Sequence, residues 1–239
     1  MFCGKCGHSL YGIESTVQYS ESRDSQKIQT AWKDLKLILV FYILTLAVSL
    51  IYGLISYVIT SPKLEFVYWS AYIIIVLVFL KLTWSETKPV FKFYKSEMKV
   101  VFELIGITIC AYGFLKGYFY LFEYFQWPTL NTVDGYLTVN WPIWSFFVLS
   151  AALPAIFEEI AFRGIIQTNL AKVLTNSEAL IIQAALFSVI HISPIIFISH
   201  FVMGLLVGWI RFRVGHIYYG IILHFLWNSA VIFSELEIL

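Results

Sequence analysis

The sequence predicts an all-α fold, a polytopic bundle of transmembrane helices, from its composition and from the length of its apolar stretches. Of the 239 residues, 59% are apolar and 13% are charged, and the mean hydropathy is +0.79. Soluble domains carry about 25% charged residues. Several apolar stretches approach the ~20 residues that a helix needs to cross a bilayer. A multi-pass membrane protein is therefore expected. A net charge of +1 gives no reason to expect a nucleic-acid partner.

Turn residues and charges divide the apolar part of the chain into segments of helical length. Pro154 is expected to kink the fourth segment one turn before Glu158. The predicted spans are 35–60, 64–82, 100–122, 143–170, 178–192, 195–210 and 217–233.

The chain is expected to consist of a polar tail, residues 1–34, and a transmembrane domain, residues 35–239. The stretch 15–30 is rich in Ser, Gln and charges, which predicts flexibility. Cys3, Cys6 and His8 resemble half of a zinc ribbon and are possible zinc ligands, although the second cysteine pair is absent. A degenerate tail without metal is the alternative. Residues 1–35 lack the apolar core of a secretory signal peptide.

Lysine and arginine residues predict the orientation. The tail, the loop 81–99, Lys172, Arg211 and Arg213 fall on one side of the membrane under this count of spans. The positive-inside rule places that side, and with it the N-terminus, in the cytoplasm. The expected location is the cell membrane.

Glu158, Glu159 and Arg163 stand in the middle of the fourth span. Ionisable groups at bilayer depth are costly and indicate a functional site by default. Glu159 and Arg163 are four residues apart, so they share a helical face and can form an ion pair. Glu158 is left without a local partner, which suits proton transfer. The alternative is that all three side chains form one ion-pair cluster that joins helices.

Two further polar pairs lie on later spans, each with helical spacing. They are Phe187-x-x-x-His191 and His224-x-x-x-Asn228. At 1.5 Å per residue, Glu158, His191, His224 and Asn228 lie roughly 21, 20, 12 and 18 Å from the assumed cytoplasmic ends of their spans. The four side chains are therefore expected at similar depths.

The segment between these pairs carries a small-residue pattern. Gly204 and Gly208 are four residues apart, which favours close helix packing. His200, one turn before Gly204, is interpreted as structural.

The motifs Glu158-Glu159-x-x-x-Arg163, Phe187-x-x-x-His191 and His224-x-x-x-Asn228, in this order on separate spans, resemble those of the CPBP intramembrane proteases. This is the CAAX-protease and bacteriocin-processing family, also called Abi. The resemblance covers about residues 143–232. The family usually has eight transmembrane helices, so about seven to eight spans are expected.

The resemblance implies an intramembrane endopeptidase acting on a peptide or membrane-protein substrate. Glu158, assisted by His191, would activate a water, and His224 with Asn228 would stabilise the oxyanion. Arg163 would hold Glu159 in a supporting role. A metalloprotease is the alternative, with Glu158, His191 and His224 binding Zn²⁺. No HExxH pair is present, which favours the version without a cofactor.

Two other classes of protein would also carry polar residues inside spans. A transporter would distribute them along a pathway and show a repeat between its halves, and neither is seen. A non-catalytic membrane scaffold would use them only to join helices.

Overall fold

The computed structural model describes residues 11–59, 61–93, 98–127 and 141–238, and this part of the chain is helical, with no strand. Five of its helices are long and apolar enough to cross a membrane, and two apolar helices are shorter. The prediction of an all-α polytopic bundle is confirmed. Each of the seven predicted spans corresponds to one of these helical segments.

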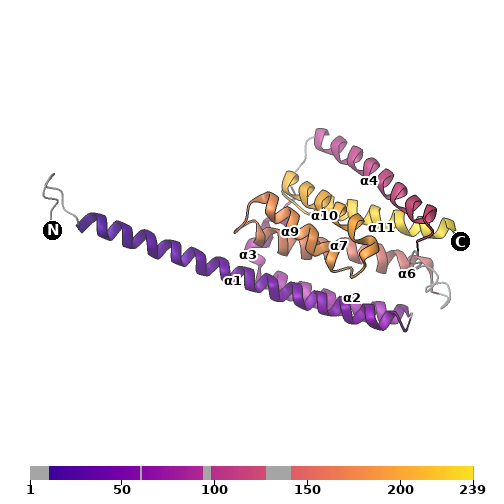
Figure 1. The fold of residues 1–239 in the computed structure, drawn as a ribbon, viewed down its shortest axis with the longest axis horizontal. Coiled ribbons are helices and arrows are strands. Elements are labelled where there is room, and N and C mark those ends of the chain that lie inside the picture. Colours follow the sequence, from indigo (N-terminus) through magenta and orange to yellow (C-terminus); the bar gives the residue numbers. More distant parts are fainter. Residues whose placement is uncertain (1–10, 60, 94–97, 128–140, 239) are drawn as a thin grey trace.

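The first two helices form an antiparallel hairpin. Helix α1 (Tyr11–Ser56) is followed by α2 (Pro62–Leu82), which runs back along it (Figure 1). The stretch 15–30, for which flexibility is predicted, is helical in the structure, because α1 begins at Tyr11 and includes it. A stable span serves as the nucleus from which helix propagates into a polar extension at little cost.

The fourth span is one helical segment that changes its winding twice. It contains α6 (Ile143–Phe147), the π-helical turn η2 (Val148–Ala152), α7 (Leu153–Glu159), the π-helical turn η3 (Ile160–Ile166) and α8 (Gln167–Leu170). Pro154 lies in the first turn of α7, directly after η2. Proline lacks an N–H group, and the changed winding accommodates it at this position.

The last three helices pack around this fourth span. They are α9 (Asn176–Val189), α10 (Pro194–Val214) and α11 (Tyr218–Ile238). A capping box between Thr175 and Glu178 starts α9. Gly215, with φ of 81°, ends α10 in the left-handed conformation that favours glycine.

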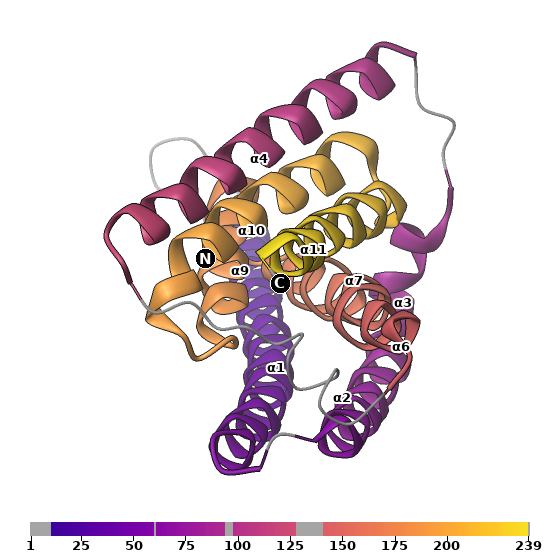
Figure 2. The same cartoon turned by 90° about the vertical axis from the view of Figure 1, so that its right-hand side faces the viewer.

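The short helix α3 (Trp84–Thr87) and the 3₁₀ turn η1 (Lys88–Phe91) follow α2, and α4 (Met98–Tyr124) comes next. Helices α7, α9, α10 and α11 lie centrally, with the α1–α2 hairpin on one side and α4 on the other (Figure 2). The fourth span therefore has protein on several sides, which is where polar groups can find partners.

Candidate functional site

Glu158 and Glu159 are the last two residues of α7, directly before the π-helical turn η3. Glu159 is fully buried, and Glu158 is 7% exposed. Neighbouring residues of a helix point about 100° apart, so the two carboxylates face different partners. Single π-helical turns inside α-helices are found frequently at functional sites.

Glu159 belongs to a buried ion pair. Its Oε1 atom accepts a hydrogen bond from Arg163 Nη1 at 2.8 Å, and His224 Nδ1 lies 3.0 Å from the same oxygen. Arg163 also donates from Nη2 to the backbone oxygen of Gly204 at 3.3 Å. The predicted pairing of Glu159 with Arg163 is present in the structure, and His224 is a partner that the spacing did not indicate.

Glu158 faces two histidines and bonds to neither. Its Oε2 atom lies 3.9 Å from His191 Nε2 and 3.8 Å from His224 Nε2. Both distances exceed a hydrogen bond, and within the described residues this oxygen has no hydrogen-bond partner. The structure thus brings Glu158, His191 and His224 together from three helices, as the depth estimate predicted.

The partners of the Nδ1 atoms fix how the two imidazoles are protonated. His191 Nδ1 lies 2.8 Å from the backbone oxygen of Phe187, which can only accept. His224 Nδ1 lies beside the Glu159 carboxylate. In the neutral form of each ring, Nδ1 therefore carries the proton, and Nε2 faces Glu158 as an acceptor.

Asn228 is the predicted site residue that the structure does not join to the cluster. It is one turn after His224 on α11 and is partly exposed. Among the hydrogen bonds of the described residues, none links its side chain to Glu158, Glu159 or either histidine. Its carboxamide is on the same helix face as His224 and remains a candidate by position alone.

The glycines of α10 allow the helices to approach closely. A Cβ atom at Gly204 would lie 2.9 Å from the Cα of Ala184 on α9, and one at Gly208 would lie 2.5 Å from Gln183 Nε2. The packing interpretation of this pattern agrees with the structure. It also brings the backbone oxygens of α10 within reach of buried polar side chains.

Two glutamines of this packing were missed from the sequence. Gln183 Nε2 donates to the oxygen of Gly204 at 2.8 Å, and Gln167 Nε2 donates to that of Gly208 at 2.9 Å. Both are fully buried. Gln167 is four residues after Arg163, so helical spacing could have placed it on the same face.

His200 was interpreted as structural, and the structure places it against the site. The centroids of its ring and of the His191 ring are 4.0 Å apart. Its Nδ1 atom lies 2.9 Å from the oxygen of Ile196. Ile192, the residue directly after His191 in the chain, has a φ of 53°. A β-branched residue in this region is strained, and such strain is concentrated at functional sites.

The metal alternative requires several donor side chains gathered around one ion. In the part of the chain that the structure describes, no three His, Cys, Asp or Glu side chains form a group suited to a metal ion. Glu158, His191 and His224 have donor types that zinc binds, but they do not form such a group among the described residues. Cys3, Cys6 and His8 lie outside the described residues.

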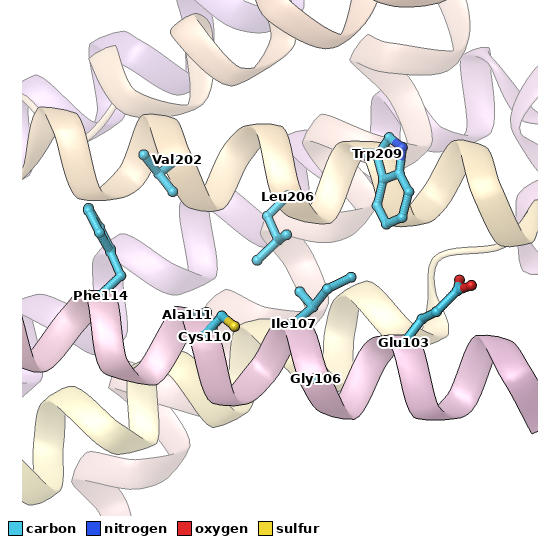
Figure 3. A pocket seen from close by; sticks show the side chains of 9 residues that line it. All are labelled: Glu103, Gly106, Ile107, Cys110, Ala111, Phe114, Val202, Leu206 and Trp209. Atoms are coloured by element: carbon cyan, nitrogen blue, oxygen red, sulfur yellow. The ribbon is translucent and has the colours of Figure 1, made fainter.

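A groove of about 550 Å³ between α4 and α10 lies apart from these carboxylates. Figure 3 shows its lining, which is apolar except for Glu103 at one end. It includes Val202, Leu206 and Trp209, whereas Gly204 and Gly208 face α9. The groove is on another face of α10 from the candidate site and plays no part in it.

The fold and this site define the chain as a multi-pass membrane protein with a buried carboxylate and histidine cluster. The model of one protein family, described as type II CAAX prenyl endopeptidase Rce1-like, matches residues 140–230. This match confirms the predicted CAAX-protease family for the segment that holds the cluster. At the level of the family it supports a CAAX-type intramembrane protease. No curated protein and no solved structure gave a match.

Proposed function

We propose that the protein hydrolyses peptide bonds within the membrane, with Glu158 and His191 activating the attacking water. The observation that carries the proposal is the Oε2 atom of Glu158, which is buried without a hydrogen bond and lies 3.8–3.9 Å from two histidine Nε2 atoms. A buried acceptor that lacks a partner in the folded chain is suited to a water or substrate.

The positions of the acceptors suggest how water would be held. A water molecule that donates one hydrogen to Glu158 Oε2 and the other to His191 Nε2 keeps its lone pairs free. As a lone pair forms a bond with the carbonyl carbon of the substrate, one proton passes to this pair of acceptors. When the C–N bond breaks, the same proton is returned to the leaving amine.

His224 and Asn228 would stabilise the oxyanion of the tetrahedral intermediate. Unlike the neutral ring, a His224 that donates from Nε2 must carry a proton on both ring nitrogens, and the Glu159 carboxylate, 3.0 Å from Nδ1, would compensate the positive charge of that state. Removing one such donor typically lowers kcat by about 10²–10³-fold. Arg163 keeps the charge of Glu159 compensated.

The substrate class follows from the family. A peptide or membrane-protein substrate is consistent with a CAAX protease. The proposed orientation places the N-terminus in the cytoplasm, because the basic segments 81–99 and 211–213 then share that side.

The test is the variant Glu158→Gln, which should abolish cleavage of a verified substrate in reconstituted vesicles, because the amide cannot take a proton from water. Glu103→Gln is the matched control. It changes another glutamate of a membrane-spanning helix, and this carboxylate pairs with Arg213 far from the cluster. Equal cleavage by wild type and Glu158→Gln would refute the proposal and favour the scaffold interpretation.

A further inference from the structure

We infer that Tyr72 of α2 is a further catalytic residue, whose hydroxyl donates a hydrogen bond to the oxyanion formed from the substrate carbonyl. The inference rests on the proposed function. It concerns a part of the chain that the family model does not cover, since the match begins at residue 140.

Tyr72 is 1% exposed, and its hydroxyl has no hydrogen-bond partner among the described residues. Leaving a buried hydroxyl unsatisfied costs about 1–3 kcal/mol. Replacement by phenylalanine would remove that cost without creating a cavity. A buried hydroxyl without a partner is explained if its hydrogen bond is made to a molecule that enters from outside the folded chain.

The surroundings of Tyr72 indicate which partner this is. Helix α2 packs against α7 and η3, which carry Glu158, Glu159 and Arg163. Tyr72 interacts electrostatically with all three of these side chains, yet it forms a hydrogen bond with none of them. A group that comes between the hydroxyl and Glu158 can accept from the phenol, and in hydrolysis that group is the substrate carbonyl.

The neighbouring Tyr68 provides a contrast on the same helix. It is one turn earlier, and its ring centroid lies 5.9 Å from that of Tyr72. Its hydroxyl already pairs with Ser49 Oγ at 3.3 Å. The hydroxyl of Tyr68 therefore has a partner within the fold, whereas that of Tyr72 has none among the described residues.

The experiment compares Tyr72→Phe with Tyr68→Phe in the full chain, reconstituted in vesicles, by kcat, KM and thermal stability. Tyr72→Phe should lower kcat by roughly a hundredfold, the effect of one oxyanion donor. Its KM should change less than twofold, because the hydrogen bond forms only in the transition state. The values of kcat and kcat/KM should therefore fall by about the same factor. Its melting temperature should be unchanged or higher. Tyr68→Phe should retain kcat.

Two outcomes would overturn the inference. One is an unchanged kcat for Tyr72→Phe. The other is a loss of activity that follows a loss of stability, as expected if a tightly held structural water were the partner. Glu158→Gln assayed in parallel keeps the two proposals apart. If Glu158→Gln is inactive and Tyr72→Phe is fully active, only the role of Tyr72 is wrong, whereas cleavage by Glu158→Gln refutes the proposed function itself.

Discussion

The two adjacent glutamates show how differently one turn of helix can use the same side chain. On the paired side, Glu159 Oε1 accepts hydrogen bonds from Arg163 and His224. The Arg163 guanidinium also donates a hydrogen bond to the backbone oxygen of Gly204. On the open side, Glu158 Oε2 faces two imidazoles without a hydrogen bond. A paired charge holds helices together, and an unpaired acceptor is available for chemistry. Neighbouring helix positions point about 100° apart, so these adjacent carboxylates meet different partners although they share one turn of α7.

The largest expected effect on stability comes from removing the Glu159 carboxylate on the paired side. Glu159→Ala leaves the Arg163 guanidinium buried without its carboxylate, which should cost about 3–5 kcal/mol. Thermal unfolding in detergent should show a clear loss for Glu159→Ala and little change for Glu158→Gln. Equal losses for both variants would mean that the two carboxylates do not differ in role.

A smaller effect is expected behind the paired side, where α9 and α10 touch. Gly204→Ala puts a methyl group 2.9 Å from the Ala184 backbone, so the helices must separate. Overpacking of this kind typically costs about 1–3 kcal/mol. Gly113→Ala on α4 is the control, because nothing lies within 4 Å of its added methyl, and it should keep or slightly raise the melting temperature. If Gly204→Ala were equally harmless, the close contact would not hold the oxygen of Gly204 in place for Arg163.

On the open side, a substitution at Ile192 should raise the stability of the protein instead of lowering it. Asparagine tolerates a positive φ far better than isoleucine, so Ile192→Asn should raise stability by up to about 1 kcal/mol. Val189 is the control, since it is exposed to a similar extent (44% against 43%) but has an ordinary helical backbone. Val189→Asn should lower the melting temperature. A lower melting temperature for Ile192→Asn as well would show that the strained turn beside His191 is held by its side chain.

The smallest expected effect concerns metal on the open side. The mechanism uses Glu158 and the two Nε2 atoms without an ion, so exhaustive chelation should leave activity unchanged. Elemental analysis should be made on protein lacking residues 1–8, because Cys3, Cys6 and His8 could bind zinc that is irrelevant to catalysis. Zinc that is retained by the truncated protein and lost with His191→Ala or His224→Ala would instead establish the metalloprotease.

The class of fold, the helical segments and the pairing of Glu159 with Arg163 can be predicted from the sequence alone. These follow from local rules, namely apolar segments of bilayer length and side chains four residues apart on a helix. Helical spacing also predicts similar depths for Glu158, His191, His224 and Asn228, and the structure brings the first three together. Depth along a helix is a one-dimensional quantity, and a sequence can supply it.

Which side chains meet between the helices depends on how each helix is rotated about its axis, and this is seen only in the folded structure. The rotation of each helix depends on packing against its neighbours, such as the contact of Gly204 with Ala184, and no local pattern encodes it. Helical spacing therefore does not predict that His224 bonds to Glu159 or that the His200 ring packs against that of His191. Tyr72 was found buried on the helix that packs against the site. The lack of a hydrogen-bond partner for its hydroxyl among the described residues depends on the positions of all the neighbouring helices.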